Sequence, residues 1–140
     1  METIHKVEGH ISVVTEGEAH SPTEGAAATS ATLTANDAEL YARFFRVLSD
    51  PTRVRLLHLL LEAPDVGRTV SDLVAAVGAP QSRISTHLGC LRWCGLVQTS
   101  REGKQVYYRI ADSRIRELLA LGGAIMREHA AGVASCGVIR

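Results

Sequence analysis

The 140-residue sequence predicts a mainly α-helical domain with one β-hairpin. Apolar residues recur at helical spacing from about residue 37 to residue 93, and the short turn Gly78-Ala79-Pro80 joins two of these helical segments. After Gly95 the apolar period changes to two, which is typical of strands. Two helices joined by a tight turn and followed by a hairpin are the elements of a winged helix-turn-helix. The fold class that we expect is therefore mainly α with a β-hairpin wing.

A helix-start signal separates the first two predicted helices. Asp50 is suited to the N-cap position and Pro51 to the first position of a helix. The helix from Pro51 to about Glu62 is apolar over most of its circumference, so we expect it to lie at the centre of the core. The helix before it has one apolar stripe, formed by Leu40, Phe44, Val47 and Leu48.

The predicted helix-turn-helix begins at a capping-box pattern, with Thr69 at the N-cap and Asp72 three residues later. Its second helix runs from Pro80 to about Trp93, and we call it the reading helix. Helical spacing directs three apolar side chains of the reading helix toward the core, namely Ile84, Leu88 and Leu91.

The wing and a final helix complete the predicted domain. Apolar and polar residues alternate on both sides of a charged turn, Arg101-Glu102-Gly103-Lys104, which predicts a hairpin. An amphipathic helix follows from about Ser113. Gly122 and Gly123 lie within it and permit another helix to approach closely, as at a dimer seam.

The polar face of the reading helix and the wing tip are the predicted DNA contacts. Short polar groups near a helix N-terminus can approach base edges and phosphates, helped by the positive helix end. Cations at a hairpin tip suit the neighbouring DNA backbone or minor groove. The predicted DNA-binding residues are Gln81, Ser82, Arg83, Ser85, Thr86 and His87 on the helix, with Arg101, Lys104 and Gln105 on the wing.

Charge is unevenly distributed along a chain whose net charge is zero. Residues 1–36 contain five glutamates and one lysine, so they carry a charge of −4 and the remainder carries +4. We expect a flexible acidic N-terminal arm over residues 1–36, a winged helix-turn-helix over residues 37–129 and a C-terminal tail over residues 130–140. There is no secretory leader, no long apolar run and an odd number of cysteines, which indicates a cytoplasmic protein without a membrane role.

Cysteine spacing points to a metal site on the reading helix. Cys90 and Cys94 are four residues apart, so they share one helical face and can bind one metal ion. Cys136 lies in the predicted tail, outside any periodic segment, where packing explains it poorly. His87 shares the face of the pair and is a possible extra ligand. The alternative for the pair is structural: Cys90 can be a core residue and Cys94 a small residue at a helix end.

Several segments together resemble the ArsR/SmtB family over about residues 37–128. The resemblance is carried by Leu48-Ser49-Asp50-Pro51-Thr52-Arg53, Ser85-Thr86-His87-Leu88, Cys94-Gly95-Leu96-Val97 and Glu102-Gly103-Lys104-Gln105-Val106-Tyr107-Tyr108. The resemblance implies a homodimeric winged helix-turn-helix repressor that binds double-stranded operator DNA and is released when an inducer binds. It also implies that the first and last helices of the chain form the dimer interface.

The family's metal sites differ between members, so each must be compared with this sequence. The helix before the turn has no Cys-x-Cys, and the last helix lacks the paired ligands of zinc-, cobalt- or nickel-binding members. Cys90, Cys94 and Cys136 are similar to the ligand set of cadmium- and lead-responsive members, and mercury-responsive members carry the first two. Three thiolates favour soft ions, so the expected inducer is Hg(II), Cd(II) or Pb(II), whose binding would derepress metal resistance genes.

Two other functions are alternatives. The first is a thiol redox or persulfide sensor on the same fold, in which Cys90 and Cys94 are oxidised instead of metallated. The second is an enzyme, but the sequence has no glycine-rich phosphate loop, nucleophile elbow or paired carboxylates in a pocket-forming pattern. We therefore expect neither an enzyme nor a small-molecule substrate.

Overall fold

The computed structural model of the protein describes residues 32–138. The chain divides into two units, Met1–Leu33 and Thr34–Arg140, and the elements below belong to the second. The predicted acidic arm lies outside the described residues from residue 1 to residue 31, so its character stays a prediction.

Side-chain caps define the starts of the first two helices. Helix α1 (Ala35–Leu48) begins at a capping box in which Thr34 and Asp37 bond reciprocally, so the helix starts two residues before the expected Asp37. Helix α2 (Pro51–Leu61) has Asp50 as its N-cap, as predicted. The Asp50 carboxylate accepts hydrogen bonds from the backbone N–H groups of Thr52 at 2.8 Å and Arg53 at 3.1 Å.

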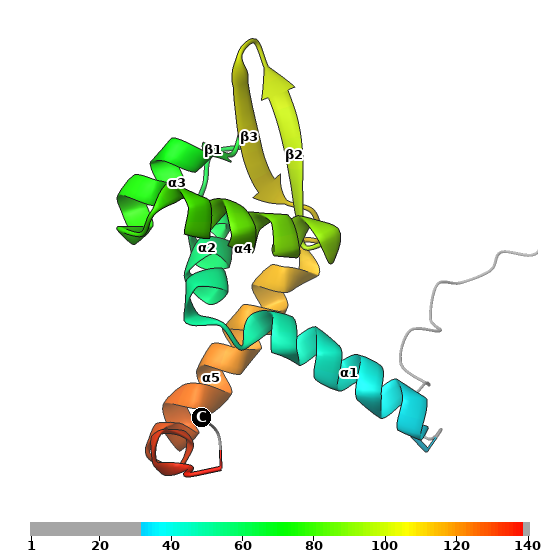
Figure 1. The fold of residues 1–140 in the computed structure, drawn as a ribbon. Coiled ribbons are helices and arrows are strands. Elements are labelled where there is room, and N and C mark those ends of the chain that lie inside the picture. Colours follow the sequence, from blue (N-terminus) through cyan, green and yellow to red (C-terminus); the bar gives the residue numbers. More distant parts are fainter. Residues whose placement is uncertain (1–31, 139–140) are drawn as a thin grey trace, which may run out of the picture. The chain divides into compact units, whose positions relative to one another are not determined.

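The helix-turn-helix is formed by α3 (Val70–Val77) and α4 (Gln81–Trp93). Thr69 and Asp72 form the predicted capping box at the start of α3. Gly78 ends α3 with a φ of 72°, a left-handed conformation that glycine adopts without steric cost. These features confirm the predicted turn, and α4 is the reading helix (Figure 1).

A three-stranded antiparallel sheet holds the wing. Strands β2 (Val97–Glu102) and β3 (Gln105–Ile110) form the predicted hairpin, and β3 also pairs with β1 (Arg68–Thr69). Strand β1 was not predicted from the sequence, because two residues are too short to show a periodic pattern. Gly67 precedes β1 with a φ of 95°, and a Cβ there would lie 2.3 Å from the carbonyl oxygen of Tyr108. The absence of a side chain at Gly67 therefore lets β1 approach β3.

The buried core joins α2 to the helix-turn-helix. Leu56 and Leu57 of α2 are fully buried, and the predicted inner side of α4 is fully buried against the same core. Val97 at the start of the wing is 2% exposed, which fixes the hairpin to the end of α4. The fully buried apolar side chains are Leu56, Leu57, Leu73, Ile84, Leu88 and Leu91.

Helix α5 (Arg114–Ser135) is longer than the sequence analysis predicted. It contains a non-helical residue, His129, and then continues to Ser135. Residues 130–135 of the expected tail are therefore helical, and Cys136 caps the helix. Residues 130–135 are mostly small, so they show no apolar repeat from which this extension could be predicted. In residues 32–138, no helix is both long and apolar enough to cross a membrane.

Truncation of a buried side chain on α4 should destabilise the domain. Leu88→Ala removes a fully buried side chain and leaves a cavity, so the free energy of unfolding should fall by about 2–5 kcal/mol. Chemical denaturation followed by circular dichroism measures this change. Ser85→Ala, on the exposed face of the same helix, is the matched control, and an equal effect of both substitutions would contradict the burial of Leu88.

Candidate DNA interface and thiolate metal site

The N-terminal half of α4 exposes a continuous polar face. Its first turn receives no side-chain hydrogen bond from the N-cap Pro80, and the Arg83 N–H donates to the Pro80 carbonyl at 3.0 Å, so the N–H groups of Gln81 and Ser82 are available to an anion such as a DNA phosphate. The Thr86 hydroxyl donates to the Ser82 carbonyl at 2.9 Å and retains its capacity to accept. The exposed side chains of this face are Gln81, Ser82, Arg83, Ser85 and Thr86, all predicted DNA contacts.

The wing tip is narrow and carries cations. Gly103 and Lys104 are the two residues between β2 and β3, and Gly103 has a φ of 61°. Arg101 therefore lies in β2 and Gln105 in β3, directly beside the turn, and these side chains are exposed together with Lys104. A tip of this form can reach the DNA backbone next to the groove that holds α4.

His87 has a different position from the other predicted contacts. Its side chain is only 13% exposed, and its Nδ1 lies 3.8 Å from Oδ1 of Asp50 at the start of α2. Partial burial tends to raise the pKa of Asp50. Hydrogen bonds from the backbone N–H groups of Arg53 and Thr52, together with the charges of His87 and Arg53, outweigh this effect and hold the pKa below its usual value. This contact supports a structural role for His87, while its predicted roles in DNA and metal binding stay predictions.

Cys90 and Cys94 lie next to each other at the C-terminal end of α4. Cys90 is half-buried, Cys94 is exposed, and the Cys94 backbone N–H donates to the Cys90 carbonyl at 3.0 Å. Partial burial, the neighbouring Cys90 charge and a thiol hydrogen bond to Cys90 raise the pKa of Cys94, whereas the positive charge of Arg53 opposes this rise. Two adjacent thiols, one accessible from solvent, are suitable donors for a soft cation.

The third predicted ligand is not gathered with the first two in a single chain. Cys136 is half-buried at the C-cap of α5. Within residues 32–138 no three His, Cys, Asp or Glu side chains are close enough to hold one metal ion. The structure thus brings together Cys90 and Cys94 but not Cys136.

Two arginines that were not predicted from the sequence bind carbonyls at helix ends. Arg53 Nε donates to the Val47 carbonyl, and another nitrogen of its guanidinium donates to the Arg46 carbonyl at 3.1 Å, in the last turn of α1. Arg68 Nε donates to the Leu59 carbonyl near the end of α2 at 3.1 Å. A single arginine has no spacing pattern in the sequence that would reveal such a partner.

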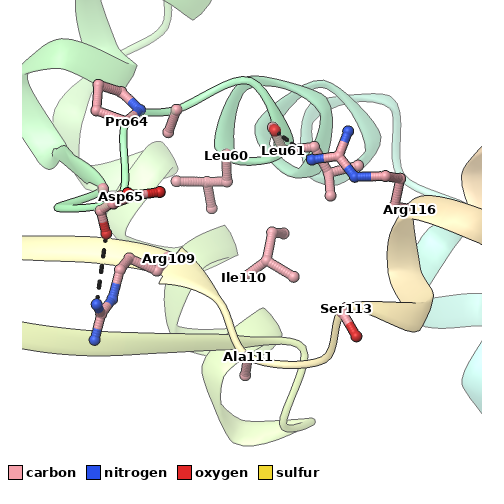
Figure 2. A pocket seen from close by; sticks show the side chains of 11 residues that line it. Leu60, Leu61, Pro64, Asp65, Arg109, Ile110, Ala111, Ser113 and Arg116 are labelled. Carbon is pink, nitrogen blue, oxygen red and sulfur yellow. Dashed lines mark hydrogen bonds between the residues drawn. The ribbon is translucent and has the colours of Figure 1, made fainter.

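A cavity of about 380 Å³ lies where the end of α2, the end of β3 and the start of α5 meet (Figure 2). Arg116 donates to the Leu61 carbonyl at 2.8 Å on one side, and Arg109 donates to the Asp65 carbonyl at 3.5 Å on the other. Both guanidinium groups therefore bind backbone carbonyls at or just beyond the end of α2. They connect the wing and α5 to α2.

Comparisons with known proteins agree with this architecture. The sequence pattern of the bacterial regulatory proteins of the arsR family matches residues 50–99. The chain is 40% identical over 95 residues to a probable mercury resistance operon repressor of Streptomyces lividans, which covers 68% of this chain and 74% of the relative. The chain belongs to the arsR family. It is a DNA-binding transcriptional regulator and not an enzyme.

Two further similarities extend the comparison of this arsR-family chain. The HTH-type transcriptional regulator CmtR of Mycobacterium tuberculosis is 45% identical over 78 residues, which is 56% of this chain and 64% of that protein. The homodimeric winged helix-turn-helix domain of Mb0332 from Mycobacterium bovis has a TM-score of 0.58 and 32% identity, and the match covers 71% and 92% of the two chains. The predicted family and winged helix-turn-helix fold are confirmed.

Removal of the wing charges should weaken DNA binding without changing sequence preference. Arg101→Ala with Lys104→Ala should lower affinity for all duplexes and reduce the slope of log affinity against log salt by about one for each lost phosphate contact. Fluorescence anisotropy on a duplex selected from a random library measures the affinity and its dependence on salt. Arg43→Ala on α1 serves as the control, and an unchanged salt slope in the double variant would contradict a phosphate contact at the wing.

Proposed function

We propose that this arsR-family regulator is a repressor that binds operator DNA in its metal-free form and is released by a soft thiophilic ion, Hg(II), Cd(II) or Pb(II). The observation that carries this proposal is the adjacent thiol pair, Cys90 and Cys94, at the end of the helix that exposes the DNA-facing residues. Two relatives, a probable mercury resistance operon repressor and the transcriptional regulator CmtR, support the same class of regulator. Release would derepress metal resistance genes in the cytoplasm.

The proposed repressor is a homodimer. Large apolar side chains on α1 and α5 remain exposed in the single chain, including Tyr41, Phe45 and Ile125 at 57, 52 and 53%. Apolar surface of this extent on two helices favours a partner. Mb0332 supports a second copy as that partner, because it is described as homodimeric. A two-fold dimer would present two copies of α4 to successive major grooves of an imperfect palindrome.

The proposed metal site is completed by Cys136 of the partner subunit. Cys136 lies at the end of α5, whereas the thiol pair lies at the end of α4, and these cysteines do not meet in one chain. A ligand from a second copy would make metal binding depend on the dimer arrangement. Metal binding would therefore act on the spacing of the two α4 helices.

The chemistry of the thiolate ligands restricts which metal ions can act as the inducer. Three thiolates suit Hg(II) and Pb(II), which accept three sulfurs, while Cd(II) often requires a fourth ligand. His87 is the candidate for that position, although Asp50 already contacts it at 3.8 Å. Zinc usually takes four ligands, so three cysteines leave it one short.

A thiol redox or persulfide sensor is the alternative function. The positions of Cys90 and Cys94, one turn apart at the end of α4, favour it, because formation of a disulfide requires two neighbouring thiols. The raised pKa of Cys94 opposes it, because the thiolate is the form that reacts with oxidants. Release by peroxide or polysulfide in metal-free solution would support this alternative.

Ultraviolet titration of the reduced protein tests the proposed metal site. Cd(II), Pb(II) and Hg(II), added separately, should each produce sulfur-to-metal charge-transfer bands that saturate near one ion per subunit. Cys90→Ser, Cys94→Ser and Cys136→Ser should each weaken the bands, and Ser135→Ala is the control next to the third ligand. Wild-type protein without such bands at micromolar metal would exclude this function and favour the redox alternative.

Metal affinity should increase with pH. The pKa of Cys94 is raised, so its thiol is protonated at neutral pH and metal binding must release the proton. The dissociation constant for Cd(II) should fall by about tenfold per pH unit for each proton released. Competition titrations at about pH 6, 7 and 8 measure this, with Cys94→Ser showing a shallower slope. Affinity that is independent of pH would show that thiols are not the ligands.

A further inference from the structure

The cavity between the end of α2, the end of β3 and the start of α5 combines an apolar wall with two cations. Its volume of about 380 Å³ is within the range of pockets that hold small molecules. In Figure 2, the side chains of Leu60 and Ile110 lie between the guanidinium groups of Arg109 and Arg116. Among the described residues that line the cavity, Asp65 is the only acid, so the two arginines leave a net charge of +1. Such a lining suits a small ligand with an apolar part and a negative group.

Arg109 has a donor that no group of the described chain uses. Its Nε atom is buried and has no hydrogen-bond partner among residues 32–138. The contact of its Nη1 with the Asp65 carbonyl is 3.5 Å long, longer than an ordinary hydrogen bond, so it restrains the guanidinium only weakly. A buried donor without a partner destabilises a protein unless water, an ion or a ligand satisfies it. The edge formed by Nε and Nη2 can bind a carboxylate through two parallel hydrogen bonds, so an oxyanion would satisfy Arg109.

Arg116 supplies the second cation from the start of α5. One nitrogen of its guanidinium donates to the Leu61 carbonyl at 2.8 Å, which fixes the group beside the cavity. A guanidinium has five N–H donors, so this contact leaves others for a second acceptor. In the described part of the chain, neither Arg109 nor Arg116 forms an ion pair with a carboxylate, Asp65 included. Both cations are therefore available to an anion from outside the chain.

We propose that this cavity binds a small organic anion whose carboxylate contacts Arg109 and whose apolar part packs against Leu60 and Ile110. Arg116 adds a second positive charge beside the ligand. These residues belong to α2, β3 and α5, so the bound anion joins the base of the wing to the last helix. The site is independent of the proposed metal site, because none of the described residues that line the cavity is a cysteine.

A titration of the full-length, metal-free protein followed by heteronuclear NMR tests the class of ligand, with hexanoate, hexanol and inorganic phosphate as the probes. Hexanoate should shift the Arg109 Nε signal and the amides of residues 109–116, and should saturate in the millimolar range that a ligand of this size can reach. The amides of the wing tip, residues 101–105, should not shift. Hexanol has no charge and phosphate has no apolar part, so each should bind at least about tenfold more weakly. Hexanol or phosphate binding as tightly as hexanoate, or no saturable shift with hexanoate, would overturn the inference.

Three substitutions test whether the probe binds in the cavity. Arg109→Gln and Arg116→Gln each remove one cation and should weaken hexanoate binding by about tenfold or more. Ala63→Leu adds bulk to the lining and leaves both arginines in place, so it tests the cavity independently of the contacts that the arginines make with the backbone. Arg127→Gln, an exposed arginine of α5 outside the cavity, is the matched control and should bind as wild type does. Wild-type affinity for hexanoate in both Arg109→Gln and Ala63→Leu would contradict the inference.

Discussion

The burial of one side of α4 is the constraint on which the rest of the structure depends. Ile84, Leu88 and Leu91 are fully buried against the leucines of α2. Because a helix has 3.6 residues per turn, fixing three residues fixes the direction of all the others. The short polar side chains of the first two turns are then exposed, and Cys90 and Cys94 come to lie together at the other end. One packed face thus sets both the candidate DNA surface and the candidate metal site.

Helix α2 connects α4 to the rest of the domain, because side chains contact other elements at both of its ends. Asp50 and Arg53 connect its start to α4 and α1, and Arg68 and Arg116 bind carbonyls at its end from β1 and α5. Charge-assisted hydrogen bonds to backbone carbonyls are directional, so they restrict rotation as well as separation. This arrangement suits a regulator whose DNA-facing and inducer-binding groups lie on one helix.

Local signals in the sequence predicted most of the fold. The N-cap at Asp50, the capping box at Thr69, the apolar side of α4 and the alternating wing strands are all short-range patterns, and the structure confirms them. Strand β1 and the extension of α5 to Ser135 were missed, because two residues and a segment of mostly small residues carry little periodicity. The helix-end contacts of Arg53 were also missed, since a guanidinium partner depends on tertiary packing. The Cys90–Cys94 pair was predictable from spacing alone, whereas spacing gave no position for Cys136 relative to the pair, and the structure does not bring the three together within residues 32–138.

The central claim is that an ion bound to the α4 thiols reduces DNA affinity. The most direct test is to measure the affinity of the reduced protein for a selected duplex without metal and with one equivalent of Hg(II) per subunit, for wild type and for the Cys90→Ser/Cys94→Ser double variant. The account predicts about a 100-fold loss for wild type, equivalent to about 2.7 kcal/mol, and no loss for the double variant. An equal loss in both proteins, or none in wild type, would contradict the account.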